Sequence, residues 1–308
     1  MALSRGRRCW LVLSICVVTA SVLTTLAIAG EKQAVISATA FETGEGERIE
    51  EYALCPGRQR ALGGGVVQSG QPPFAFIQAS GPLDASGTPG GTKDGDIAKR
   101  WFVAIKQVID QTEWKVFVIC ARVPGAKIET ASFTTDEEEV GKKSVRCPDS
   151  RRALGGGVVP IGSGEGTSIT ASGPLDRSGE VSKTKTGDVA KSWFAAVRDM
   201  SGENLRRFKV FVICAKGSSA TISTNKASAD PGADVQALEQ CDGPKRAVGG
   251  GILPLGAPGD FTLRANGPLD DTATPSETKD GDVADIWYAA AFNATGSLEA
   301  VKVSAICV

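Results

Sequence analysis

Short apolar segments separated by turn-forming residues predict a chain that is built almost entirely of β-strands. Segments 115–120 and 209–214 both read Lys-Val-Phe-Val-Ile-Cys, and they are rich in β-branched and aromatic residues on both faces. Such a run is typical of a central strand that is covered above and below. Segments 101–106, 77–80 and 168–172 predict further strands, and Gly-Pro and Gly-Gly pairs are expected to mark the turns between them.

The chain offers no clear amphipathic helix. Ile97, Trp101 and Ala104 fall at helical spacing, but the β-branched residues that follow favour a strand. We expect about six short strands in each stretch of roughly 90 residues, and this number predicts a β-sandwich or a small barrel.

The same residue pattern occurs three times, at a spacing of 92 to 94 residues. In each copy a cysteine is followed by Arg-Ala-Leu/Val-Gly-Gly-Gly, Gly-Pro-Leu-Asp, Thr-Lys-x-Gly-Asp, a tryptophan and a closing Ile-Cys. This triplication predicts an all-β protein of three tandem modules, 34–125, 126–219 and 220–308. Only five residues separate one module's last cysteine from the next module's first strand, so the modules should pack together, with a closed pseudo-threefold arrangement as one outcome.

The first 29 residues differ from the rest of the chain. Arg5, Arg7 and Arg8 precede an apolar run that ends in Ala27-Ile28-Ala29, and this pattern predicts a secretory signal peptide over residues 1–29. The run is about 20 residues long, so an uncleaved membrane anchor is the alternative. After cleavage the protein is expected to be secreted or held at the cell surface, with no membrane contact.

Charge and cysteine content narrow the possible partners and compartments. Cleavage would remove three arginines and no acidic residue, which leaves 31 basic against 35 acidic residues and a net charge of −4. Without a basic block to neutralise phosphates, nucleic acid is not an expected partner. Six cysteines remain, and an even number in an exported chain indicates an oxidising compartment.

Each repeat contains two of these cysteines. Because equivalent repeats should form equivalent bonds, we predict the disulfides Cys55–Cys120, Cys147–Cys214 and Cys241–Cys307. The alternative, in which the last cysteine of one repeat bonds to the first of the next, would leave the first and last cysteines unpaired.

The triple glycines 63–65, 155–157 and 249–251 have two interpretations. Glycine permits a positive φ, a bulge or close backbone packing inside a sheet. It also forms anion-binding loops, but a phosphate loop needs a Lys-Ser/Thr that opens a helix, and here valine or isoleucine follows. We therefore favour the structural interpretation.

The repeated tryptophans are candidates for stacking against a sugar. The alternative is a role in the core, which the aromatic residue that follows each of them favours. The residues concerned are Trp101, Trp193 and Trp287.

Two aspartates in each repeat are separated by 12 residues of variable sequence: Asp84 and Asp96, Asp176 and Asp188, Asp270 and Asp282. Constant length suggests that both ends are held, and one candidate holder is calcium, with Asp94 and Asp280 as extra ligands. The alternative is turn chemistry with ion pairs to Lys93, Lys185 and Lys279 or to Arg60, Arg152 and Arg246. We favour the alternative because Thr186 replaces the extra aspartate and the spacing is not that of an EF-hand, so neither metal nor cofactor is expected.

Catalytic chemistry is restricted because the chain contains no histidine. Serine–histidine and cysteine–histidine nucleophiles and histidine-bound zinc are therefore excluded. Paired carboxylates cleave glycosides in other proteins, and Asp84 with Asp96 would be the candidates here. Threefold repetition is common for binding or structural units and unusual for an active site, so we do not expect an enzyme.

The pattern Cys-Pro…Arg-Ala-Leu-Gly-Gly-Gly…Trp…Val-Ile-Cys-Ala, at 55–121 and 147–215, resembles modules of uncharacterised secreted bacterial proteins. The resemblance implies a bacterial, exported and non-enzymatic protein, and it implies no particular activity. The third repeat departs from the pattern, with Asp242 in place of the proline and Val308 in place of the final alanine.

Three functions are compatible with these observations. The first is a secreted or cell-surface binding protein whose three equivalent modules bind an extracellular ligand, such as a glycan, with avidity. The second is a structural protein of the envelope or extracellular matrix, and the third is a carboxylate-dependent hydrolase. Exposed aromatic residues at three equivalent sites would favour the first function, and buried tryptophans would weaken it.

Overall fold

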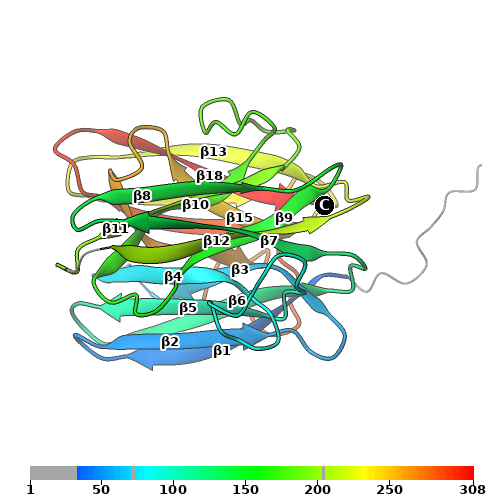
Figure 1. Cartoon of the computed structure of the whole chain (residues 1–308), viewed down its shortest axis with the longest axis horizontal. Helices are drawn as coiled ribbons and strands as arrows, with labels where there is room; N and C mark the ends of the chain where they lie inside the picture. The colour runs from blue at the N-terminus through cyan, green and yellow to red at the C-terminus, as the bar shows by residue number, and fades with distance from the viewer. Residues whose placement is uncertain (1–32, 71–73, 203–204) are drawn as a thin grey trace, which may run out of the picture. The chain divides into compact units, whose positions relative to one another are not determined.

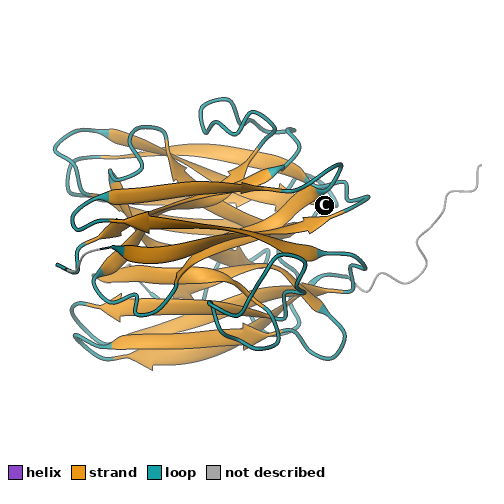
Figure 2. Cartoon of the chain, in the orientation of Figure 1, coloured by secondary structure: helices purple, strands orange, loops and turns teal. Residues whose placement is uncertain are grey.

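The computed structural model describes residues 33–70, 74–202 and 205–308, so the predicted signal peptide lies outside the described residues. Strands and loops make up the described part of the chain, in which no helix occurs (Figure 2). The prediction of an all-β protein is confirmed. A helix of the length and apolarity needed to cross a membrane is accordingly not found among these residues.

Every repeat contributes six strands, as predicted (Figure 1). The first repeat contains β1 (Val35–Thr43), β2 (Arg48–Leu54), β3 (Arg60–Gln68), β4 (Ala75–Leu83), β5 (Arg100–Gln107) and β6 (Thr112–Ala121). The second contains β7 (Lys127–Thr135), β8 (Val140–Arg146), β9 (Arg152–Pro160), β10 (Thr167–Leu175), β11 (Ser192–Asp199) and β12 (Arg206–Ala215). The third contains β13 (Thr221–Ala229), β14 (Asp234–Gln240), β15 (Ala247–Pro254), β16 (Phe261–Leu269), β17 (Ile286–Asn293) and β18 (Glu299–Cys307).

Two antiparallel groups of three strands form each repeat. In the first repeat, β6 lies between β1 and β3, while β5 lies between β2 and β4. The central position of β6 explains why its sequence is apolar on both faces. A disulfide ties the end of β2 to the end of β6, and the predicted pairs Cys55–Cys120, Cys147–Cys214 and Cys241–Cys307 are confirmed, with Cα–Cα distances of 5.4, 5.5 and 5.6 Å.

These groups join across repeat boundaries into three six-stranded sheets. The strand orders are β1-β6-β3-β16-β17-β14, β2-β5-β4-β9-β12-β7 and β13-β18-β15-β10-β11-β8. One antiparallel bridge makes each junction, between Val66 and Asn266, Ser80 and Val158, and Ser172 and Ile252. Because every repeat shares one sheet with each of the other two, the repeats close on themselves with pseudo-threefold symmetry.

The triple glycines lie inside β3, β9 and β15, and Gly81-Pro82 lies inside β4. The expectation that these glycine pairs mark turns is therefore wrong. The triple glycines have no positive φ, but the β3–β6 register shifts between Ala61 and Gly63, so the expected bulge is confirmed. Close backbone packing is confirmed too, because a Cβ atom on Gly63 would lie 2.2 Å from the carbonyl oxygen of Val248.

Antiparallel pairing places the loops at two ends of the strands. Val35 pairs with Cys120 and Thr43 pairs with Thr112, so β1 begins where β6 ends. We call this the terminal end; it carries the loops after β2, β4 and β6 and their equivalents. The loops after β1, β3 and β5 and their equivalents form the opposite end, which we call the distal end.

Candidate functional site

The repeated tryptophans are sealed inside the protein. Trp101, Trp193 and Trp287 are only 2%, 1% and 1% exposed. Their indole N–H groups donate to Ser80 Oγ, Ser172 Oγ and Asn266 Oδ1 at 3.0, 3.0 and 2.7 Å. Each ring lies against the middle glycine of its own triple-glycine segment. A sugar-stacking platform at these positions is therefore wrong, and the interpretation as core residues is correct.

The paired aspartates shape the long loop after the fourth strand of each repeat. The first carboxylate accepts hydrogen bonds from a hydroxyl residue two positions later and from a threonine eight positions later. The second accepts the backbone N–H of the repeated lysine at 2.7 Å in all three repeats. The aspartates thus make turn contacts with backbone and hydroxyl donors, and in the part of the chain that the structure describes no ion pair joins them to the repeated lysines or arginines.

Asp84 and Asp96 line one shallow hollow of about 370 Å³ together with Lys99. Burial alone would raise the pKa of Asp84, but hydrogen bonds from Ser86 and Thr92 outweigh burial and hold the pKa below its usual value. A general acid for glycoside cleavage needs a raised pKa, so this carboxyl is poorly suited to donate a proton. No group of three or more metal-ligating side chains occurs in the described ranges.

The same loops form hydrogen bonds with the first strand of the next repeat, and we call this contact the clasp. Gly95 N–H donates to Ile128 O and Ile128 N–H donates to Asp96 O, at 2.8 and 2.9 Å. Equivalent pairs join residues 187 and 188 to 222, and residues 281 and 282 to 36, so the third repeat clasps the first. The extra aspartates accept further hydrogen bonds from the first strand of the next repeat. Asp94 accepts the N–H of Thr130 and Asp280 accepts the N–H of Ala38, and Thr186 supplies the one oxygen that this contact needs in the second repeat.

A lysine from each central strand closes the clasp. Lys209 Nζ donates to the carbonyl oxygens of Pro89 and Thr92 at 3.2 and 2.9 Å, and Lys115 and Lys302 make equivalent contacts with residues 275–278 and 181–184. Burial lowers the pKa of Lys209 and of Lys302. Sequence reasoning missed these residues, although Lys-Val-x-x-Ile-Cys recurs in all three repeats and was a usable signal.

A cavity of about 510 Å³ lies at the distal end, on the seam between the first and second repeats. Its apolar lining comes from Phe76, Val108 and Met200, and its polar lining includes Gln78, Lys106 and Glu165. Two of the polar groups are oriented by neighbours, because Arg48 Nε donates to Gln78 Oε1 and Lys106 Nζ donates to Gly46 O, each at 2.8 Å. The volume is in the range of small-ligand sites, about 300–1,000 Å³.

Side chains fill the equivalent seam between the third and first repeats. Arg264 takes the place of Gln78, and it is buried with its guanidinium 4.4 Å from the ring centre of Phe74 and 4.9 Å from that of Phe292. Its Nε lies 3.1 Å from Asp234 Oδ1. The cation, the two rings and the carboxylate together occupy this seam.

The seam between the second and third repeats is bridged by a side chain, beside which a smaller hollow of about 320 Å³ remains. Arg198 takes the place of Lys106, and its Nη2 donates across the seam to Gly259 O at 2.8 Å. Lys106 bonds instead within its own repeat, which leaves the space between the first and second repeats open.

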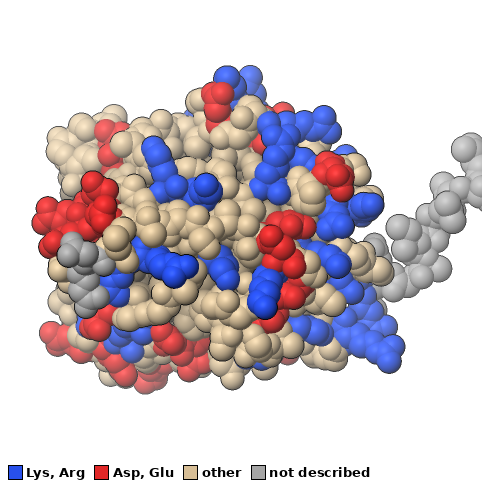
Figure 3. Space-filling model, in the orientation of Figure 1, with Lys and Arg blue, Asp and Glu red and all other residues tan. Residues whose placement is uncertain are grey.

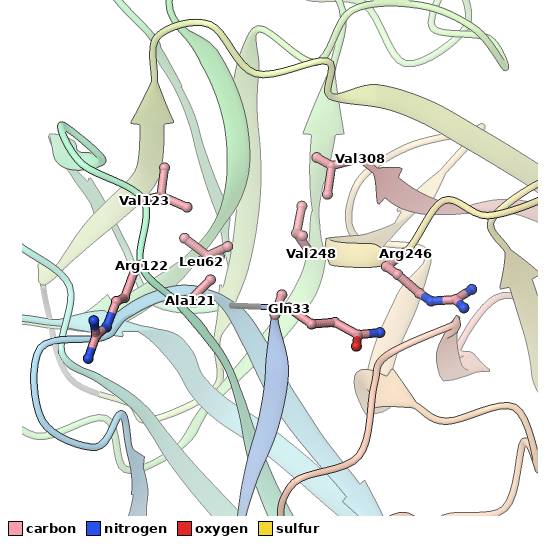
Figure 4. Close-up of a pocket in the computed structure, with 9 residues that line it drawn as sticks. Gln33, Leu62, Ala121, Arg122, Val123, Arg246, Val248 and Val308 are labelled. Carbon is pink, nitrogen blue, oxygen red and sulfur yellow. The ribbon is translucent and has the colours of Figure 1, made fainter. Parts of the chain in front are cut away.

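A second cavity, of about 250 Å³, lies at the terminal end, where the third repeat meets the first (Figure 4). Leu62, Val123, Val248 and Val308 surround its centre, while the guanidinium groups of Arg122 and Arg246 point away from it (Figure 4). Arg246 pairs with Asp285 at 2.7 Å. Its volume lies below the range of small-ligand sites, about 300–1,000 Å³, so the seam cavity is the better candidate site.

Comparison with known proteins adds no relative, since no family model matches the chain and no curated protein matches it. The resemblance to secreted bacterial modules therefore stays a prediction.

Proposed function

We propose that the protein is an exported, non-enzymatic binding protein whose ligand occupies the cavity between the first and second repeats. The observation that carries the proposal is the difference among the three seams. One backbone arrangement occurs three times, yet Arg264 fills one seam, Arg198 bridges another and leaves a hollow of about 320 Å³, and the seam between the first and second repeats keeps a cavity of about 510 Å³. An apolar cavity with a few oriented polar groups is the usual form of a ligand site.

Among the described residues the geometry favours one such site, the seam cavity, whereas the repeats predict three equivalent sites. The residues that occur three times are used by the fold: the tryptophans in the core, the aspartates in turns and the lysines in the clasps. The residues that line the seam cavity differ among the repeats. A monovalent site therefore fits the structure better than an avidity mechanism.

Two observations favour binding without catalysis. The absence of histidine removes the commonest general base, and the hydrogen bonds that lower the pKa of Asp84 make it a poor general acid. Export is supported by the three disulfides, which are typical of extracellular proteins, and by the basic and apolar character of residues 1–29.

The test is a cavity-filling substitution combined with an unbiased ligand search. Glycan and peptide arrays are probed with the wild-type protein and with Val108→Trp, whose indole would occupy the cavity. Leu298→Trp is the matched control, because Leu298 is exposed in a distal-end loop away from this seam. We expect at least about a tenfold loss of affinity in Val108→Trp and none in the control.

Two results would contradict the proposal. One is a ligand that binds both tryptophan variants as well as it binds the wild type. The other is an absence of any array ligand together with self-assembly that grows with protein concentration, which would favour a structural protein of the envelope or matrix.

A further inference from the structure

The distal-end loops carry charge of one sign only. In the sequence of segments 44–47, 69–74, 108–111, 136–139, 161–166, 200–205, 230–233, 255–260 and 294–298 there is no lysine or arginine. The described acidic residues in them are Glu45, Glu47, Asp110, Asp136, Glu137, Glu138, Glu139, Glu165, Asp230 and Asp260. On the face in Figure 3, acidic side chains gather at the left, where Figure 1 shows the loops before β8 and after β11.

Basic side chains on the adjoining strands hold the loops in place. Lys106 donates to Gly46 O, Arg198 donates to Gly259 O and Arg206 donates to Ser163 O. Lys106 and Arg198 are each directed at a carbonyl oxygen, and neither of these two pairs with a distal-loop carboxylate within the described ranges. Among the described residues, the carboxylates of Glu137, Glu138 and Glu165 make no ion pair, so they are available to an external cation.

Exposed apolar side chains stand among these carboxylates. Ile109, Met200 and Leu205 project from distal loops of the first and second repeats, and Leu205 is 61% exposed. Apolar residues on a loop surface cost little singly, but a group of them at one end of a protein marks an interaction surface. The acidic residues and the exposed apolar side chains of the distal end together indicate a surface that binds a partner.

Two hollows that share Met200 bring these acidic and apolar side chains together. Met200 lines the seam cavity and also a neighbouring hollow of about 320 Å³, whose other walls are Glu137, Glu138 and Arg198. Phe76, Val108 and Met200 line the cavity together with Glu165 and Lys106, and Glu137 and Glu138 line the hollow together with Arg198, so acidic groups outnumber basic ones by three to two. An occupant would need an apolar group for the cavity and positive charges beside it.

We propose that the ligand of the seam cavity is a basic segment of another polypeptide, which inserts an apolar side chain between Phe76, Val108 and Met200. This inference rests on the proposed function and specifies its ligand class. Lysine or arginine side chains that flank the inserted residue would pair with Glu165, Glu137 and Glu138. Charge complementarity of this kind speeds association and makes the affinity sensitive to salt.

The test measures the affinity of three short synthetic peptides for the full-length protein after export. One alternates lysine with leucine, one alternates glutamate with leucine, and one alternates lysine with serine. We expect the lysine–leucine peptide to bind best and to weaken as salt is added. The double variant Glu137→Lys/Glu138→Lys should weaken its binding by roughly tenfold. The single variant Met200→Lys, at an exposed position, provides a second test that does not disturb the core.

The matched control reverses two exposed acidic residues at the other end of the protein, Asp271→Lys/Glu277→Lys, with the same change in net charge. Equal weakening by both double variants, or equal binding of the glutamate–leucine peptide, would overturn the ligand class. If Val108→Trp still abolished binding in either case, the cavity would stand as the site and only the basic ligand would fail. Absence of binding by all three peptides would likewise overturn this inference, and the array search decides separately whether the cavity binds anything.

Discussion

Each glycine of a triple-glycine segment meets a different neighbour. The first glycines of the three segments pack in a cycle, since a Cβ atom on Gly63, Gly155 or Gly249 would strike the backbone of the next segment. The middle glycine lies against a tryptophan ring, and the third lies against the strand that continues the sheet into another repeat. Three consecutive positions therefore lack room for a side chain for three separate reasons.

Substitution of the first glycine of a triple-glycine segment should destabilise the whole protein. A Cβ atom on Gly155 would lie 2.3 Å from Leu62 O and 2.9 Å from the Cα of Gly63, and backbone atoms cannot rotate away. We expect Gly155→Ala to lower the free energy of unfolding by about 2 kcal/mol or more, measured by urea denaturation. Gly296→Ala is the control, because nothing lies within 4 Å of its Cβ position; similar losses in both variants would contradict the packing argument.

Asp84 should make the stability of the protein depend on pH in the acid range. The pKa of Asp84 is lowered in the folded protein, so its contribution is complete above the unfolded pKa of 3.8 and is lost as the pH falls through the folded value. We expect Asp84→Asn to cost about 1 kcal/mol near neutral pH. The difference from wild type should shrink below pH 3.8, as measured by chemical denaturation across the acid range. A difference that grew on acidification would have the wrong sign for this mechanism.

Strands and disulfides could be predicted from the sequence, because both depend on local pattern and on the equivalence of the repeats. Residues 115–120 read as a central strand and lie in β6, and pairing two cysteines within each repeat was sufficient to predict all three bonds. The glycine pairs were misread as turns because the Gly81-Pro82 pair and the triple glycines are turn-like only when considered locally. Their positions inside strands follow from contacts with other repeats, which local pattern does not report.

The clasp lysines should contribute to stability through their carbonyl contacts. Lys302 is 3% exposed, and its ammonium group donates to Val181 O and to Thr184 O, the latter at 2.6 Å. Lys302→Met would keep the apolar stem and leave the carbonyl groups without their donor. We expect a loss of about 2 kcal/mol in the free energy of unfolding.

Lys226 provides the control for this substitution. It lies opposite Lys302 in the β13–β18 register but is exposed to solvent. Lys226→Met should change the stability by less than about 0.5 kcal/mol. A loss as large as that of Lys302→Met would show that strand pairing, rather than the carbonyl contacts, is what the lysine supports.

The candidate site was beyond sequence reasoning for a physical reason. The tryptophans and aspartates recur in all three repeats, and these recurring residues are the ones that the repeated fold uses. The seam cavity depends on the residues that do not recur: Lys106 stands where Arg198 and Phe292 stand in the other repeats. Whether a side chain at such a position opens or closes a seam depends on which side chains of the next repeat it contacts. These contacts are known only when the arrangement of the three repeats is known.

At the scale of the whole molecule, closure makes the three repeats interdependent. Every sheet contains strands from two repeats, and every clasp joins one repeat to the next, including the clasp from residues 281 and 282 to Ile36. The last junction has no covalent linker, so only these contacts and the sheets hold the third repeat to the first. Loss of one repeat would therefore expose half of two sheets.

This interdependence predicts a single unfolding transition, which loss of one disulfide should shift as a unit. The bond Cys147–Cys214 closes a loop with a sequence separation of 67, and a loop of that length contributes about 4 kcal/mol in the chain-entropy model. In Cys147→Ala/Cys214→Ala, scanning calorimetry should show one peak at lower temperature, with the calorimetric enthalpy equal to the van't Hoff enthalpy. Three independent modules would instead give two unshifted components and one shifted component, because only the second repeat would lose its constraint. One displaced peak therefore requires that the sheets and clasps transmit the loss from the second repeat to the other two.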